Sequence, residues 1–248
     1  MKIHAPKSHP RYLSNYYRDL ISDGVKSGVT AIHGLIAHGR GETFDYLIGE
    51  KTEPFATDAV EAATALLLLA RRPIISVNGN TAVLVPKELV AIANLLDVPL
   101  EVNLFHRSKK RERLITDHLK NQGATTVLQP DTAKIHGINS NRRLINKKGQ
   151  FEADVVFVPL EDGDRTEALI KMGKKVITVD LNPLSRTAQK ATITIVDNII
   201  RALPLLIKTV KKFQQKEESE LRQIVKNYNN KLILSQALQH IHKRLHKQ

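Results

Sequence analysis

The stretch Lys175-Val-Ile-Thr-Val-Asp180-Leu-Asn-Pro-Leu-Ser-Arg-Thr187 decides the predicted fold of this 248-residue chain. Its β-branched run at 176–179 is typical of a buried parallel strand. Asp180 stands where that strand ends, and Ser185 stands where the next helix would begin. Because ligands of open α/β sheets bind beyond the carboxyl ends of the strands, these polar residues occupy the place of a nucleotide site. The alternative is that Asp180 only caps a helix.

Five further segments have the same strand-like character, and they alternate with helix-like segments in two groups of three. Such alternation predicts an α/β fold with a Rossmann-like, doubly wound, six-stranded parallel sheet and with N-terminal and C-terminal helical additions. The change in connection between the third and fourth strands predicts that the first and fourth strands are neighbours. The expected strands lie at 74–78, 100–105, 125–128, 154–159, 176–179 and 192–196.

Three segments are expected within one compact domain. Residues 1–72 are predicted to form an N-terminal helical segment packed on the sheet, residues 73–217 the Rossmann-like core, and residues 218–248 basic C-terminal helices. Within the first segment, the sequence His38-Gly-Arg-Gly41 is predicted to be a loop between helices. Two glycines around an arginine would allow unusual backbone angles and close approach of a ligand.

Composition narrows the class of protein. Hydrophobic residues make up 42% of the chain and aromatic residues only 4%, so the core must consist mostly of Ile, Leu, Val and Ala. The absence of cysteine excludes disulfides, thiolate nucleophiles and Cys-ligated zinc, and it agrees with a cytoplasmic protein. The polar N-terminus is not a signal peptide. The longest apolar run, at 62–70, is too short to span a membrane, so no membrane partner is expected.

The formal net charge of +13 invites an alternative interpretation as a nucleic-acid-binding protein. Residues 201–248 contain 11 Lys and Arg against 3 Asp and Glu, and residues 107–113 contain five bases and one acid. Aromatic residues are not interleaved with either cluster, so neither forms a platform for base stacking. Nucleic acid is therefore a disfavoured partner, and small polyanions such as nucleotides explain the basic residues equally well.

Two standard nucleotide motifs are missing from the chain. It has no G-x-x-x-x-G-K-[ST] sequence, and no G-x-G-x-x-G follows the first expected strand. The second absence weighs against the alternative of a nicotinamide-dependent oxidoreductase. A nucleotide site would then need side-chain cations, for which guanidinium groups are suited because they bind phosphate with two parallel hydrogen bonds. The candidates are Arg18, Arg40 and Arg186, of which Arg40 stands between two glycines.

Other polar residues near the expected strand ends are candidate substrate contacts. His38, His106 and His136 each lie beside Gly or Arg, and Arg107 follows His106 in the position of a phosphate or carboxylate clamp. The ten histidines show no spacing typical of metal ligands, so no protein metal site is predicted. Glu161 and Asp162 either hold Mg²⁺ through water or belong to the first turn of a helix. The remaining substrate candidates, Asn78 and Asn80, follow the first strand.

Several long motifs carry a family resemblance. They are His9-Pro-Arg-Tyr-Leu13, Arg18-Asp-Leu-Ile-Ser-Asp-Gly-Val-Lys26, Ile32-His-Gly-Leu-Ile-Ala-His-Gly-Arg-Gly-Glu42, Phe44-Asp-Tyr-Leu-Ile-Gly-Glu50, Val77-Asn-Gly-Asn80, Phe105-His-Arg107 and the opening stretch from Asp180 to Thr187. Together they resemble archaeal phosphopantothenate synthetase, also called 4-phosphopantoate–β-alanine ligase. The resemblance covers nearly the whole chain, and the basic C-terminal tail is the variable part.

The resemblance implies an enzyme of archaeal coenzyme A biosynthesis that joins 4-phosphopantoate to β-alanine. It implies that ATP is converted to AMP and pyrophosphate with Mg²⁺, and that the chain acts as a homodimer. The ATP contacts that it implies fall on Arg18, Arg40, Asp180, Leu181, Asn182, Arg186, Thr187, Asn198 and Ile199.

The residues agree with this chemistry. A carboxylate reacts with an amine only after activation, because oxide is a poor leaving group. Attack of the carboxylate on the α-phosphorus of ATP gives an acyl-adenylate, from which the amine displaces AMP. Charge then develops on phosphate oxygens, so the protein mainly supplies cations and alignment. Arg18, Arg40 and Mg²⁺ would serve this role, and Asp180 and Asn182 would bind ribose or adenine. The base for the amine is left open between a histidine and an acid near the strand ends. The catalytic candidates of the site are Arg40 and His38.

Overall fold

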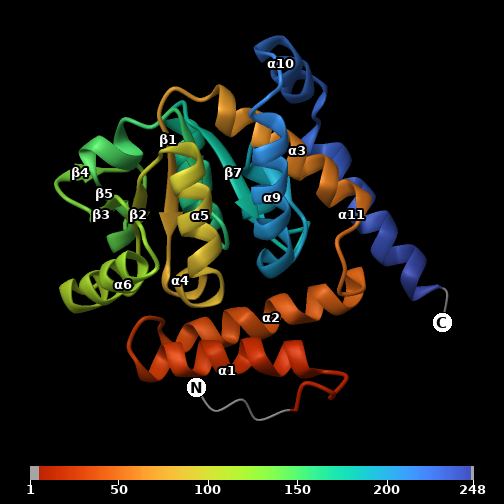
Figure 1. Ribbon diagram of the computed structural model, residues 1–248, viewed down its shortest axis with the longest axis horizontal. Coiled ribbons are helices and arrows are strands. Elements are labelled where there is room, and N and C mark those ends of the chain that lie inside the picture. Colours follow the sequence, from red (N-terminus) through yellow and green to blue (C-terminus); the bar gives the residue numbers. More distant parts are fainter. Residues whose placement is uncertain (1–5, 247–248) are drawn as a thin grey trace.

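The computed structural model describes residues 6–246 and contains one six-stranded sheet in which every strand is parallel to its neighbours. The strand order is β3-β2-β1-β6-β7-β8, so the predicted Rossmann-like fold class is confirmed (Figure 1). All six expected strands are present. They are β1 (Pro73–Val77), β2 (Leu100–Val102), β3 (Val127–Leu128), β6 (Val155–Phe157), β7 (Lys175–Val179) and β8 (Ile193–Ile195).

The order of the strands reverses between β1 and β6, as predicted. Ile75 of β1 pairs with Leu100 of β2 on one side and with Phe157 of β6 on the other. The chain leaves β1 toward β2 and β3, and it returns to the opposite side of β1 with β6. Loops after β1 and β6 therefore diverge at the carboxyl edge of the sheet, which opens a crevice there.

Alternating strand residues enter two separate cores. Ile75, Phe157 and Ile177 belong to the larger core, whereas Ile74 and Val156 face the smaller one. Burial on both faces explains the continuous apolar runs that identified the strands. Residues from α3 (Pro54–Leu69), α5 (Pro86–Leu96), α6 (Lys109–Asn121) and α9 (Ile199–Phe213) join the larger core, and α7 (Gly163–Lys171) contributes to the smaller core.

Helices α1 (Tyr12–Lys26) and α2 (Ile32–Ile48) lie side by side below the strands, next to α4 (Gly79–Leu84) (Figure 1). The predicted loop at 38–41 is wrong, because α2 continues through it without a break. Glycine serves close packing in this helix. A Cβ at Gly34 would lie 2.2 Å from Asn80 Oδ1, so glycine here lets α2 lie against the Asn80 side chain just after β1 without displacing it. The helix ends at Gly49, whose φ of 108° stops it in the left-handed region.

The segment 131–150, between β3 and β6, contains short regular pieces. A two-stranded antiparallel sheet pairs β4 (Ala133–Lys134) with β5 (Leu144–Ile145), and the 3₁₀ turn η1 (Asn141–Arg143) lies between them. The turn η2 (Lys147–Phe151) follows. Glu101 of β2 organises this segment, because its carboxylate accepts hydrogen bonds from the backbone N–H groups of Asn146 and Gln150 at 2.9 and 2.7 Å. Burial raises the pKa of Glu101 to about 7.

Two helices end the described chain, α10 (Glu218–Asn227) and α11 (Asn230–Leu245), and the short α8 (Arg186–Lys190) precedes β8. The outer edge of the sheet is closed by side chains, since Asn230 Oδ1 accepts a hydrogen bond from Thr194 N at 2.8 Å. Helix α11 also packs on α2, where Arg244 Nε donates to Leu47 O at 3.1 Å. Within residues 6–246 no helix is long and apolar enough to cross a membrane.

Candidate functional site

A cavity of about 370 Å³ lies between α2 and the carboxyl ends of the strands. The segments that follow β1, β2, β6, β7 and β8 all contribute to its wall. Seven of the residues that the sequence proposes as ATP, substrate or catalytic contacts line it, and they come from α2 and from four strand ends. They are His38, Asn78, Asn80, His106, Leu181, Asn198 and Ile199.

Asn78 and Asn80 build the cavity wall at the end of β1. Asn78 caps α4, with its side chain accepting from Thr81 N at 3.1 Å, and its Nδ2 donates to Leu160 O at 3.0 Å across the switch point. Asn80 Nδ2 donates to Gly34 O at 3.0 Å, and Asn80 Oδ1 accepts from the Thr30 hydroxyl. Both amides therefore join the strand end to its neighbours.

Asp180 organises the turn after β7. One carboxylate oxygen accepts from Asn182 N at 2.9 Å, and the other accepts from the Ser185 hydroxyl. Asn182 Oδ1 in turn accepts from Leu184 N at 2.9 Å. Burial raises the pKa of Asp180, and the hydrogen bond from Ser185 and the positive charge of Arg40 oppose this rise. The turn thus presents a carboxylate at the site edge close to a cation from α2.

The cations Arg18 and Arg40 come from the two N-terminal helices and lie outside the cavity lining, at a rim that Glu42 and Asp180 mark. Arg18 Nε donates to both carboxylate oxygens of Glu42, each at 3.0 Å, and Glu42 lines the cavity. The Arg40 side chain is exposed on α2 and forms no ion pair with residues 6–246. Arg40 is therefore available to an anionic ligand, whereas Arg18 would have to share its guanidinium with Glu42.

Arg186 and Thr187 begin α8 beside the loop that follows β6. Thr187 is buried, and its hydroxyl donates to Glu161 O at 2.8 Å. Arg186 is exposed and pairs with Glu167 of α7, with Nε 3.1 Å from Oε2. A Cβ at Gly163 would lie 2.5 Å from Arg186 Cβ, so glycine permits α7 to start against this arginine. These two residues lie behind the cavity wall.

Arg201 of α9 joins the N-terminal helices to the end of β8. Its Nη2 lies 2.5 Å from Asp45 Oδ1 of α2 and 2.6 Å from Asp197 Oδ1. Asp45 Oδ2 also accepts from Asn198 Nδ2 at 2.7 Å. Asp197 is 1% exposed, and burial raises its pKa while Arg201 opposes that rise. This cluster sets the position of Asn198 and of α2 over the cavity.

His38 points into the cavity from the middle of α2. Its Nε2 is buried and has no hydrogen-bond partner within residues 6–246. Burial lowers the pKa of His38, the nearby carboxylate of Glu42 opposes this, and Arg18 lowers it further. The imidazole is therefore neutral near pH 7 and offers a basic nitrogen to a ligand.

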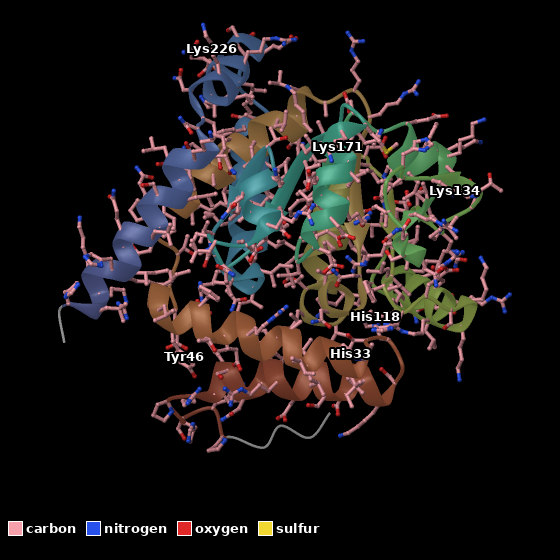
Figure 2. All side chains as sticks on the ribbon, turned by 180° about the vertical axis from the view of Figure 1, so that it is seen from behind. His33, Tyr46, His118, Lys134, Lys171 and Lys226 are labelled. Carbon is pink, nitrogen blue, oxygen red and sulfur yellow. The ribbon has the colours of Figure 1, made fainter. Side chains whose placement is uncertain are left out.

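Two of the expected substrate contacts lie away from the cavity wall. Arg107 pairs with the buried carboxylate of Glu112 at the start of α6. His136 is exposed beside the small sheet. His106 lines the cavity as expected, and His33 of α2, labelled in Figure 2, stacks on it with ring centroids 4.6 Å apart.

Sequence reasoning missed two arginines that line the cavity, Arg111 and Arg142. Arg111 donates to Val29 O at 3.0 Å and to Gly28 O at 3.3 Å, so it joins α6 to the segment before α2. Arg142 is 7% exposed and pairs with Glu161 and Asp162. Glu161 also pairs with the fully buried Arg165, which explains this acid without a metal ion. No motif in the segment 131–150 distinguished Arg142 in the sequence.

A doubly wound parallel sheet with a cavity at its switch point defines the class of α/β proteins that bind their ligands at the carboxyl edge. The comparison with known families identifies the member of that class. The chain belongs to the phosphopantothenate/pantothenate synthetase family, whose model matches residues 55–244. The resemblance seen in the motifs is thereby confirmed, and the matched relatives are named as ligases.

Three relatives show how far the similarity extends, and each is named 4-phosphopantoate–β-alanine ligase. The protein of Thermococcus kodakarensis is 51% identical over 245 residues, which cover 98% of this chain and 94% of that protein. The protein of Methanosarcina mazei is 50% identical over 240 residues, with 97% and 95% covered. The protein of Methanospirillum hungatei is 43% identical, with 97% of both chains covered.

The Arg201 cluster leads to a stability prediction. Arg201→Gln should lower the free energy of unfolding by about 3 kcal/mol, because it leaves the carboxylates of Asp45 and Asp197 without a counter-charge in a buried place. Urea denaturation followed by circular dichroism measures this loss. The control is Arg222→Gln in the exposed pair with Glu218, which should cost less than about 1 kcal/mol. Equal losses for the two variants would contradict the proposed importance of the cluster.

Proposed function

We propose that this chain condenses 4-phosphopantoate with β-alanine to form 4′-phosphopantothenate in coenzyme A biosynthesis, with ATP as the energy source. The observation that carries the proposal is the match to relatives named for this reaction along nearly their whole length. The cavity supports it, since it combines an apolar floor at Leu181 and Ile199 with basic side chains at the carboxyl edge of the sheet.

ATP would bind between the N-terminal helices and the ends of β7 and β8. Arg40 and Arg18 would contact its phosphates, because they are the cations that α1 and α2 bring to this rim. Asp180 and Asn182 would contact the ribose or the base, with Leu181 beside them in the wall. The remaining contacts proposed for ATP are Arg186, Thr187, Asn198 and Ile199.

The reaction would proceed through an acyl-adenylate. The carboxylate of 4-phosphopantoate attacks the α-phosphorus of ATP, the bond to the β-phosphate oxygen breaks, and pyrophosphate leaves. The amine of β-alanine then attacks the acyl carbon, and AMP leaves with the electron pair of the broken bond. Arg40 would counter the charge that develops on the α-phosphate oxygens, and the cavity wall would align the two reactants.

Mg²⁺ would enter with the nucleotide. Within residues 6–246 no three His, Asp or Glu side chains converge as a metal site. The donor set available here therefore fits an ion that is held mainly by ATP phosphates, as is usual for Mg²⁺. When bound, the ion would neutralise phosphate charge, and Glu42, which lines the cavity and pairs with Arg18, could reach the ion through water.

His38 would accept the proton that β-alanine must lose before its amine can attack. Its buried Nε2 lacks a partner in the described chain, and its lowered pKa leaves the imidazole neutral near pH 7. These are the properties of a general base.

The chain would act as a homodimer, with the exposed apolar residues of α1 and α2 at the contact. Leu13, Ile32 and Ile36 are all more than 60% exposed, and Tyr46 lies on the outer side of α2 (Figure 2). Large apolar side chains exposed on these two neighbouring helices support an association surface there. Sedimentation of the purified protein would give twice the chain mass, and a monomer at micromolar concentration would contradict the homodimer.

We place the enzyme in the cytoplasm, where its nucleotide substrate is found.

Product analysis tests the function. Incubation with ATP, Mg²⁺, 4-phosphopantoate and β-alanine should release AMP and pyrophosphate in equal amounts, measured by anion-exchange chromatography. Release of ADP alone would contradict the adenylate route. If no nucleotide product forms that depends on both acid and amine, the proposed reaction itself is wrong.

Arg40→Ala should lower the rate of AMP release by about 100-fold or more, because a contact to the ATP phosphates is lost. The protein should stay folded, because the Arg40 side chain is exposed. Circular dichroism provides the folding control. Unchanged kinetics would exclude Arg40 from the site.

His38→Gln should abolish the acidic limb of the profile of kcat against pH. In the wild type, kcat should fall as the pH drops through the lowered pKa of His38, because the protonated imidazole cannot accept a proton. Glu42 and Arg18, which face His38, remain in the variant and set the same background. The variant should turn over about 100-fold more slowly above that pKa and should lack the acidic limb. An identical profile at reduced rate would exclude His38 as the base.

A further inference from the structure

Arg142 is a buried arginine in the wall of the cavity whose charge the ATP contacts do not use. It lies in the 3₁₀ turn η1, between the two strands of the small sheet, and its side chain is 9% exposed. The ring of Phe105 lies 5.9 Å below its guanidinium carbon. An arginine almost never reaches such burial unless it is paired, so its partners indicate its purpose.

Those partners leave the guanidinium only partly satisfied. Nη1 pairs with Glu161 and lies 2.8 Å from Asp162 Oδ2, whereas the buried Nε has no hydrogen-bond partner within residues 6–246. Glu161 is itself shared with Arg165, which is fully buried. Two arginines therefore share one buried carboxylate, and the second carboxylate, on Asp162, is 51% exposed at the cavity.

Arg111, which also lines the cavity, is less available to a ligand than Arg142. Arg111 donates to the backbone oxygens of Gly28, Val29 and His106, so its guanidinium is used to join α6 to the segment before α2. Arg142, by contrast, contacts a carboxylate that can rotate into solvent. An anion that entered the cavity could replace Asp162 at Arg142 without opening any backbone contact.

On the basis of the proposed function, we propose that Arg142 binds the phosphate group of 4-phosphopantoate, in the position that the carboxylate of Asp162 otherwise takes. A guanidinium can give a phosphomonoester two parallel charge-assisted hydrogen bonds. Glu161 keeps the guanidinium in place from behind, since its other oxygen pairs with Arg165.

The position of Arg142 also separates the two phosphate-bearing substrates. Glu161, in the segment after β6, contacts both regions. Its carboxylate pairs with Arg142, and its backbone oxygen accepts a hydrogen bond from the Thr187 hydroxyl. Thr187 belongs to the region proposed for ATP. The acid substrate would then extend from Arg142 toward the α-phosphate of ATP, with its carboxylate at the nucleotide end.

Substrate selectivity tests this proposal. The variant Arg142→Gln should lose about 100-fold or more in kcat/KM for 4-phosphopantoate, because a buried charge-assisted contact is removed. Its KM for ATP should stay within about threefold. The preference for 4-phosphopantoate over unphosphorylated pantoate should shrink by the same factor. The matched control is Arg143→Gln, in which the next and exposed arginine is removed, and its kinetics should equal those of the wild type.

A second variant remains informative if Arg142→Gln fails to fold. Asp162→Asn removes the competing carboxylate and should lower both the KM for 4-phosphopantoate and the inhibition constant of inorganic phosphate, measured against that substrate. Unchanged constants in Asp162→Asn, or equal losses for phosphorylated and unphosphorylated pantoate in Arg142→Gln, would overturn the assignment. Failure of the wild type to release AMP would refute the proposed reaction instead, so the two failures are distinguishable.

Discussion

The contact of Arg201 with Asp45 and Asp197 is the interaction on which the site depends. A parallel sheet brings six strand ends to one edge, but an edge alone is an open surface. The cavity exists because α2 crosses that edge, and Arg201 fixes α2 there by pairing one acid on the helix with one at the end of β8. Gly34 allows the same helix to approach the end of β1 closely. The ion pairs of Arg201 at the end of β8 and the missing side chain at Gly34 near the end of β1 thus hold α2 over the edge and form the cavity.

The charges around this cavity are divided by their degree of burial. Arg40 is an exposed cation at the rim, and Arg186 is an exposed cation behind the cavity wall that pairs with Glu167. Arg142 and Arg165 are buried cations that share Glu161, so their positions are fixed before any ligand arrives. Fixed buried charge favours discrimination among ligands, because an unmatched group cannot be compensated by solvent. An exposed arginine attracts an anionic ligand, and less free energy is needed to remove water from the arginine when the ligand binds.

The sequence predicted the sheet well because both faces of its strands are buried. Continuous β-branched runs such as 176–179 arise only where neither side meets water, and the alternation of strands with helices then restricts the topology to a few orders. The loop expected at His38-Gly-Arg-Gly41 was wrong for a physical reason. Glycine lowers helix propensity by about 1 kcal/mol per residue, and no tight contact requires it at Gly39 or Gly41. The packing of the rest of α2 against α1 and α11 offsets this cost, and that packing is tertiary.

By itself, the sequence determined the fold class, the strand order and the family, because these depend on local periodicity and on long motifs. It also selected seven residues of the cavity wall, since polar residues after strands meet at one edge. Only the tertiary structure decided which arginines face that cavity. Nothing in the sequence distinguishes the roles of Arg107 and Arg142. In the structure, Arg107 pairs with Glu112 at the start of α6, whereas Arg142 lines the cavity. The difference follows from which buried carboxylate each guanidinium meets, and that depends on contacts between segments distant in the chain.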